Sequence, residues 1–229
     1  MHIVHTEASL GWGGQEIRIL TEAAGMMRRG HRVTLLCPVE ARIYEEAKLR
    51  GVSVVALPIG RKNLRGVMAL RRWLKSHPAD IVNTHSSTDS WLAALASLGL
   101  PHAAPLVRTR HISAAIPNNF TTRWLYRKAT RHIATTGELL RQQLIEQNGY
   151  APARITSVPT GVDTEHFAPG DKAAARTKLG LPQGARIIGI VATLRSWKGH
   201  RYLLDAFAQL PDEHARLVIV GDGPQREAL

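Results

Sequence analysis

The segment HIVHTEASLGWGGQEIRILTEAAGMMRRGHRVTLL, residues 2–36, indicates the class of fold. An apolar run, a glycine cluster, an amphipathic helical pattern and a second β-branched run follow one another in it. This order predicts a βαβ unit, in which the two strands lie parallel. The glycines, Gly11, Gly13 and Gly14, let backbone N–H groups approach an anion at the start of the helix. They lack the GxGxxG spacing, so a dinucleotide site is disfavoured and a plain tight turn remains open.

The same alternation continues along the first 160 residues. Short apolar runs are separated by longer amphipathic segments, which is typical of a parallel sheet covered on both faces. The expected strands span 3–6, 32–36, 52–57, 80–84, 106–109, 132–135 and 155–158. The expected helices span 15–29, 40–50, 64–76, 88–98, 119–130 and 137–147. We therefore expect an α/β fold whose first domain, residues 1–165, is a complete, doubly wound, Rossmann-like sheet.

A proline- and glycine-rich stretch, PTGVDTEHFAPGD (159–171), interrupts this pattern as a linker does. After it, strand-like runs at 186–193 and 215–220 flank a helical pattern at 199–210. Residues 166–229 are expected to begin a second Rossmann-like domain. One βαβ crossover is too little to bury its own sheet, so we expect this incomplete unit to pack on the first domain or to continue beyond residue 229.

Composition places the chain among globular proteins. Of its 229 residues 44% are hydrophobic, and its single cysteine, Cys37, lies in an apolar run and cannot form an intramolecular disulfide. The opening lacks the basic and apolar regions of a signal peptide, and the longest apolar stretch, 91–100, is about half the length that spans a bilayer. We therefore expect a cytoplasmic protein without a transmembrane helix.

The net charge of +12 is concentrated in the first part of the chain, since residues 1–160 carry +11 and residues 161–229 carry +1. Two windows, 61–75 and 108–132, contain basic side chains and no acidic ones. The helix expected around 64–74 joins apolar residues to these cations, which favours peripheral binding to an anionic membrane surface. The alternative is that Trp73 faces the sheet and the arginines are merely solvated. The basic residues are Arg61, Lys62, Arg65, Arg71, Arg72, Lys75, Arg108, Arg110, Arg123, Arg127, Lys128 and Arg131.

Several polar residues follow the ends of expected strands, where open α/β sheets bind their ligands. His85 ends the fourth strand and His111 follows the fifth. In the second unit, Arg195 and Lys198 lie where a strand ends and a helix begins. Two cations there oppose the helix macrodipole, and a bound anion would relieve that conflict, whereas the simpler interpretation is two solvated charges. No HExxH or CxxC pattern is present, so we expect no metal.

Five segments together resemble one family. WGGQE, THSS with RTRHIS, VPTGVDTEHFAP, LRSWKGHRYLLDAF and LVIVGDGPQRE occur in the order found in retaining family 4 glycosyltransferases of the GT-B fold. The likeness extends over the whole chain and is greatest to bacterial enzymes that build lipopolysaccharide or other surface glycans. It implies transfer of a sugar from a nucleotide-diphosphate sugar to a glycan or lipid-linked acceptor, at the inner face of the cytoplasmic membrane, with no cofactor or metal.

The resemblance also implies roles for particular residues. Gly13 and Gly14 match a glycine pair whose backbone lies against the donor diphosphate or sugar. Arg195 and Lys198 match a basic pair that holds the nucleotide diphosphate and steadies the leaving group. His111 matches a histidine that faces the donor sugar in the interdomain cleft. We therefore predict His111, Arg195 and Lys198 as catalytic residues, and the glycines with the two cations as donor-binding residues.

The chain departs from the family pattern after the GDGP segment. Family members continue into further βα units with a pair of glutamates that holds the donor ribose and sugar, and these are missing here, so we expect a fragment or a truncated protein. A non-catalytic acceptor-binding or partner module is therefore an alternative. A GT-B sugar-nucleotide epimerase is a second alternative, disfavoured by the transferase-like LRSWKG and VPTGVD segments. A nucleic-acid partner is not expected, because helix-turn-helix, RNP and zinc-finger patterns are missing and aromatic residues make up only 5%.

Overall fold

The computed structural model describes residues 1–112 and 114–229. These fold as two compact units, unit 1 (Met1–Gly161) and unit 2 (Val162–Leu229). The α/β fold expected from the sequence is confirmed in both units, because every assigned strand pair is parallel and helices alternate with the strands.

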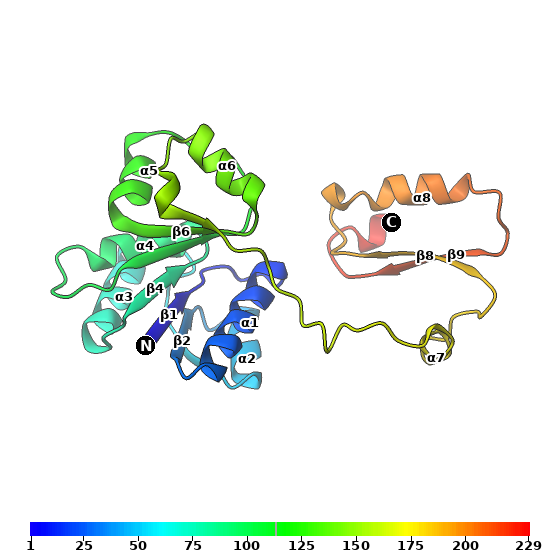
Figure 1. Ribbon diagram of the computed structural model, residues 1–229, viewed down its shortest axis with the longest axis horizontal. Coiled ribbons are helices and arrows are strands. Elements are labelled where there is room, and N and C mark those ends of the chain that lie inside the picture. Colours follow the sequence, from blue (N-terminus) through cyan, green and yellow to red (C-terminus); the bar gives the residue numbers. More distant parts are fainter. Residues whose placement is uncertain (113) are drawn as a thin grey trace. The chain divides into compact units, whose positions relative to one another are not determined.

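Unit 1 contains a seven-stranded sheet in the order β3-β2-β1-β4-β5-β6-β7 (Figure 1). The chain runs outward from β1 to β3 on one side and from β4 to β7 on the other, so β1 and β4 flank the switch point of a doubly wound fold. In register, Ile3 of β1 pairs with Val33 of β2 and with Ile81 of β4. The strands are β1 His2–Thr6, β2 Arg32–Cys37, β3 Ser53–Ala56, β4 Ile81–Thr84, β5 Leu106–Arg110, β6 Thr130–Thr135 and β7 Ile155–Ser157.

Three helices of unit 1 begin at residues whose side chains satisfy free N–H groups. Asn63 and Asn119 accept hydrogen bonds from the first turns of α3 and α5, and Ser86 and Asp89 form a capping box on α4. Helices α1, α2 and α6 begin without a side-chain cap, and α1 follows Gly13. The helical segments are α1 Gly14–Arg28, α2 Arg42–Leu49, α3 Leu64–Ser76, α4 Ser87–Ser97, α5 Phe120–Trp124, the π-helical η1 Leu125–Ala129, α6 Glu138–Glu146 and η2 Pro152–Arg154.

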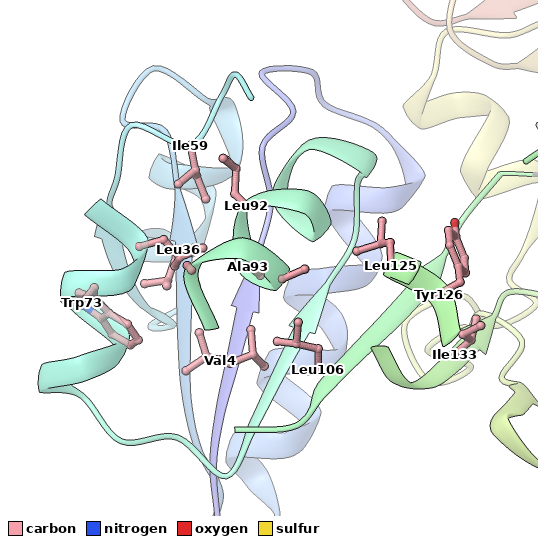
Figure 2. Close-up of a cluster of buried hydrophobic side chains, with 14 of the residues drawn as sticks. Val4, Leu36, Ile59, Trp73, Leu92, Ala93, Leu106, Leu125, Tyr126 and Ile133 are labelled. Atoms are coloured by element: carbon pink, nitrogen blue, oxygen red, sulfur yellow. The ribbon is translucent and has the colours of Figure 1, made fainter. Parts of the chain in front are cut away.

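Two apolar clusters, one on each face, hold the sheet between its helices. The larger cluster joins strand residues such as Val4 and Leu106 to Leu92 of α4 (Figure 2). The smaller cluster joins β2 to α1 and α2, with Ile19 and Leu35 at its centre and Cys37 buried beside them. Each fully buried side chain of this size contributes about 1.5–3 kcal/mol, so the two clusters account for the stability of a sheet with both faces covered.

The structure buries part of the apolar face of α3 in the core of unit 1. Leu70 and Trp73 of α3 are 0% and 8% exposed, because they lie on the helical stripe that packs into the larger cluster. The interpretation that Trp73 faces the sheet is therefore confirmed. Two cations of the second basic window, Arg108 and Arg110, are also buried, at 3% and 9% exposure, and do not belong to any exposed basic surface.

Unit 2 contains the parallel pair β8 (Arg186–Val191) and β9 (Ala215–Val220), with α8 (His200–Ala208) lying along it (Figure 1). Short 3₁₀ turns occur at η3 Ser196–Lys198 and η4 Arg226–Ala228. Strand β8 ends two residues before the expected Thr193. An additional helix, α7 (Lys172–Lys178), follows the linker and was not expected from the sequence.

Glycines let the two turns of unit 2 lie in direct contact. A Cβ at Gly221 would lie 1.9 Å from the carbonyl oxygen of Ala192, and one at Gly223 would lie 2.5 Å from that of Leu194. The N–H of Leu194 donates to the carbonyl of Asp222 at 2.9 Å. The GDG turn after β9 therefore supports the turn after β8 that carries Arg195.

Among the helices of the described residues, none has the length and apolar character needed to cross a bilayer.

Candidate active site

The sequence-predicted residues of unit 1 lie at the carboxyl edge of its sheet. Gly13 and Gly14 begin α1 after β1, His85 directly follows β4, and His111 directly follows β5. Since β1 and β4 flank the switch point, this edge is where an open α/β sheet forms its ligand crevice. The structure thus brings His85 and His111 together, with the glycine turn on the neighbouring loop.

A third histidine, His5 of β1, completes a linked row. His5 Nδ1 lies 2.8 Å from His85 Nε2, and His85 Nδ1 lies 3.0 Å from His111 Nε2. The first two rings stack at 5.1 Å between centroids. His5 and His85 are buried, whereas His111 is partly exposed at the end of the row. We call these three residues the histidine chain.

The histidine chain is electrically neutral at pH 7. Burial lowers the pKa of His5 to about 4. Burial, followed by the neighbouring His5 and His111, holds the pKa of His85 well below its usual value. Burial and then the charges of Arg18 and Arg110 lower the pKa of His111 to about 4. Each ring therefore carries one N–H and one lone pair at neutral pH.

The Asp89 carboxyl group holds the backbone of His85 in place. Its Oδ2 accepts hydrogen bonds from the Thr6 hydroxyl at 2.7 Å and the backbone N–H of His85 at 2.8 Å. Its Oδ1 accepts from the backbone N–H and the hydroxyl of Ser86. One fully buried carboxyl group therefore ties the end of β1 to the turn between β4 and α4, which fixes the backbone that carries His85.

The glycine turn lies beside two acidic side chains. The Glu7 carboxyl group accepts hydrogen bonds from the Ser9 N–H at 2.7 Å and from the side-chain amide of Gln15. Burial, followed by the nearby Asp89, raises the pKa of Glu7 to about 8, so it is mostly protonated at neutral pH. The carboxylate of Glu16 folds back toward the helix start, 3.7 Å from where a Cβ at Gly13 would lie. The positive end of α1 is therefore already partly compensated.

Arg18 connects helix α1 to the segment that follows β7. Its guanidinium donates to Glu22 at 2.6 Å, to the Thr160 hydroxyl at 3.0 Å and to the Val158 carbonyl at 2.8 Å. All three groups belong to unit 1. This buried guanidinium holds the chain leaving β7 against α1, and its charge acts on His111.

The predicted residues of unit 2 lie in the turn between β8 and α8. Arg195 and Lys198 are exposed, and among the described residues neither forms an ion pair with a carboxylate. The Arg195 guanidinium lies over the Trp197 ring, 5.3 Å from its centroid, and the Lys198 N–H donates to the Arg195 carbonyl at 3.0 Å. Gly199 then adopts a left-handed conformation, φ +77°, and starts α8. Two uncompensated cations are thus presented at a helix start without a side-chain cap.

Sequence reasoning missed His5, Glu7 and Asp89. His5 lies within an apolar strand and gave no local signal. The spacing of Ser86 and Asp89, typical of a capping box, could have identified the buried carboxyl group. Within residues 1–112 and 114–229, no group of three or more metal-binding side chains is arranged to hold a metal ion.

Comparisons with known proteins identify the family of the chain. The family described as Glycosyltransferase Family 4 matches residues 12–166, and the one described as Glycosyl transferases group 1 matches residues 171–229. Because the first match covers more than half of the chain, the chain belongs to glycosyltransferase family 4, and the family resemblance seen in the sequence is confirmed. The GT-B fold is likewise the fold of its solved structural neighbours.

Individual relatives give a more detailed picture. The D-inositol 3-phosphate glycosyltransferase of Mycolicibacterium gilvum is 36% identical over 63% of this chain and 35% of its own length. The protein of that name from Mycobacterium sp. (strain KMS) is 30% identical over 95% of this chain and 55% of its own length. The crystal structure of Anabaena Alr3699/HepE in complex with UDP-glucose matches with a TM-score of 0.79 at 20% identity, over 97% of this chain and 61% of that one. The chain therefore spans about a third to three fifths of these proteins.

Proposed function

We propose that the whole protein is a glycosyltransferase that moves a sugar from a nucleotide-diphosphate sugar to an acceptor hydroxyl. The observation that carries this proposal is the uncompensated pair Arg195 and Lys198 at the start of α8, in a chain that belongs to family 4. Permanent cations at a free helix start are suited to a diphosphate, because both the side chains and the backbone N–H groups attract negative charge.

The proposed chemistry matches these residue types. The bond between the anomeric carbon and the phosphate oxygen breaks, the nucleoside diphosphate leaves with the bonding electrons, and the acceptor oxygen forms the new bond as its proton is released. Negative charge therefore builds up on the phosphates, where Arg195 and Lys198 stabilise it without a metal. Retention of configuration is part of the proposal and rests on the family likeness.

The carboxyl edge of unit 1 is proposed to contact the neutral part of the donor. The Glu16 carboxylate lies beside Gly13, so a neutral sugar is favoured at the Gly13–Gly14 turn over a diphosphate. His111 presents a neutral ring to the same edge and can hydrogen-bond a sugar oxygen. Gly13, Gly14 and His111 are therefore proposed as sugar-contacting residues of unit 1 and, separately, Arg195 and Lys198 as diphosphate-binding residues of unit 2.

The acceptor is proposed to be a glycan or a lipid-linked glycan of the cell envelope, met at the inner face of the cytoplasmic membrane. Support comes from exposed cations such as Arg65, Arg72 and Lys75, which form no ion pair with any carboxylate in the described part of the chain. A phosphorylated small molecule is a second candidate acceptor, since the relatives named above are D-inositol 3-phosphate glycosyltransferases.

The test is release of nucleoside diphosphate from UDP-glucose and GDP-mannose, with and without D-inositol 3-phosphate or a lipid extract as acceptor. Arg195→Ala is expected to lower turnover about 10²–10³-fold, since removing one donor that stabilises transition-state charge typically costs about 2.7–4 kcal/mol. Lys178→Ala removes an equal, exposed charge from α7 and is the control. Equal turnover by Arg195→Ala and Lys178→Ala would contradict the role proposed for Arg195. Donor binding without turnover would favour an acceptor-binding or partner module.

A further inference from the structure

The histidine chain has two free ends of different character. Each of its two hydrogen bonds uses one nitrogen from each ring, which leaves His5 Nε2 and His111 Nδ1 outside the bonds. His5 Nε2 is buried, and no residue that the structure describes offers it a hydrogen-bond partner. His111 Nδ1 lies on the partly exposed ring at the carboxyl edge of the sheet.

Only two proton arrangements satisfy both hydrogen bonds when all three rings are neutral. In the first, His5 Nδ1–H donates to His85, His85 Nδ1–H donates to His111, and His111 keeps its proton on Nδ1. In the second, every bond is reversed: His111 Nε2–H donates to His85, His85 Nε2–H donates to His5, and His5 carries its proton on the buried Nε2. Any mixed arrangement sets two donors or two acceptors against each other.

The buried end of the chain distinguishes the two arrangements. In the second, His5 Nε2 is an N–H without an acceptor, whereas in the first it is only a lone pair without a donor. Among backbone groups, buried N–H donors without partners are rarer than under-used acceptors, and we expect the same preference for the imidazole nitrogens. The first arrangement is therefore favoured, although the Nε2–H form is the usual one for a solvent-exposed histidine side chain.

The arginines near His111 are consistent with this direction. An Nδ1 lone pair on His111 would be a natural acceptor for a guanidinium N–H. Instead, Arg18 donates to Glu22, Thr160 and Val158, and Arg110 donates to the carbonyls of Ile112 and Ala114. Burial, followed by the charges of both arginines, lowers the pKa of His111, while the arginines donate to other acceptors.

We propose that His5 and His85 are positioning residues that fix His111 as the Nδ1–H tautomer, so that it presents a hydrogen-bond donor at the carboxyl edge of unit 1. Asp89 supports this role by fixing the backbone of His85. The ligand atom that this donor meets would be an oxygen of the bound sugar, and that last step rests on the proposed function. The tautomer itself does not depend on it.

The direct test is a long-range ¹H–¹⁵N spectrum of the full chain, labelled with ¹⁵N-histidine, at pH 7. The protonated and unprotonated nitrogens of a neutral ring have well-separated ¹⁵N shifts, so the tautomer of each ring is read directly. The chain has eleven histidines, and the His111→Gln variant identifies the His111 signals by their loss. The proposal expects His5, His85 and His111 all as Nδ1–H forms, and an Nε2–H form of His111 overturns it.

Two variants of His85 test the positioning role. His85→Leu removes the donor to His111 Nε2, and His111 is expected to revert to a mixture dominated by Nε2–H. His85→Asn places an amide N–H near the former Nδ1, and is expected to restore the Nδ1–H form of His111. An unchanged His111 tautomer in His85→Leu contradicts the role, even if wild type has the expected tautomer.

Circular dichroism establishes that each variant is folded. If His85→Leu does not fold, the wild type and His85→Asn still test the proposal. An Nε2–H form of His111 in either protein contradicts it. A sample that shows the expected tautomers but binds neither UDP-glucose nor GDP-mannose would count against the proposed function and leave the histidine chain standing. The two failures are therefore distinguishable.

Discussion

Raising the pH from 6.5 to 8.5 is expected to destabilise unit 1 through Glu7. This side chain is completely buried, and burial raises the pKa of Glu7 from its usual 4.5 to about 8. A carboxyl group with a raised pKa in the folded state holds its proton there while the unfolded chain has released it. Its contribution to stability is therefore complete below about pH 4.5 and is lost as the pH rises through 8.

The magnitude follows from these two pKa values. Between pH 6.5 and 8.5 the linkage relation gives a loss of about 2 kcal/mol from this one group. Glu7→Gln removes the titration and keeps an oxygen that can accept from the Ser9 N–H, while the amide of Gln15 can turn to present its oxygen. The difference in unfolding free energy between Glu7→Gln and wild type is therefore expected to increase by about 2 kcal/mol over this range. Because both proteins contain the same histidines, those contributions cancel.

The assay is urea-induced unfolding, followed by tryptophan fluorescence at closely spaced pH values. This signal reports mainly on unit 1, because Trp197 of unit 2 is exposed. Glu146→Gln, which changes an exposed carboxylate at the end of α6, is the control and should leave the pH dependence unchanged. Identical pH profiles for Glu7→Gln and wild type would refute the reasoning, because Glu7 would then be ionised in the fold.

Further predictions concern the other features. The unfolding free energy of unit 1 is expected to fall as the pH drops from about 6.5 to 4. The pKa values of His5 and His111 are lowered to about 4 in the fold, so the unfolded chain takes up protons at a higher pH than the folded chain does. Urea titrations that give a constant unfolding free energy across this range would contradict this prediction. Gly221→Ala is expected to unfold unit 2, since its Cβ would lie 1.9 Å from a carbonyl oxygen, and hydrogen exchange of β8 and β9 at wild-type rates would be the opposing result. The protein is expected to float with anionic but not neutral vesicles, and the double variant Arg72→Glu with Lys75→Glu to float less; equal flotation with both vesicle types removes the membrane interpretation.

Much of the fold could be predicted because the periodicity of apolar residues indicates which faces of the strands and helices are buried. The seven strand positions of unit 1 follow from apolar runs, which in the central strands β1 and β4 are buried on both faces. Helix α7 could not be predicted in this way, because nearly all of Lys172–Lys178 is exposed and has no apolar stripe. Its only local signal is the Asp171 cap, which lies in the stretch interpreted as a linker.

The candidate site was predictable where a residue follows a strand and hidden where the residue lies within one. His85 and His111 stand at strand ends, and topology alone places both at the same edge of the sheet. His5 contributes through its ring contacts across strands, which a linear pattern does not encode. The sequence could not decide whether Trp73 faces the sheet or a membrane. Cations flank the apolar stripe of a helix in both cases.

Arg195 and Lys198 are proposed to bind the diphosphate of a sugar nucleotide. Calorimetric titration of UDP, GDP and ADP into wild type, Arg195→Ala and Lys178→Ala tests it most directly. At least one nucleotide is expected to bind wild type and Lys178→Ala equally, and Arg195→Ala at least about tenfold more weakly, since a charge-assisted hydrogen bond is worth about 1.5–3 kcal/mol. No binding to wild type, or equal binding to Arg195→Ala, would contradict the account.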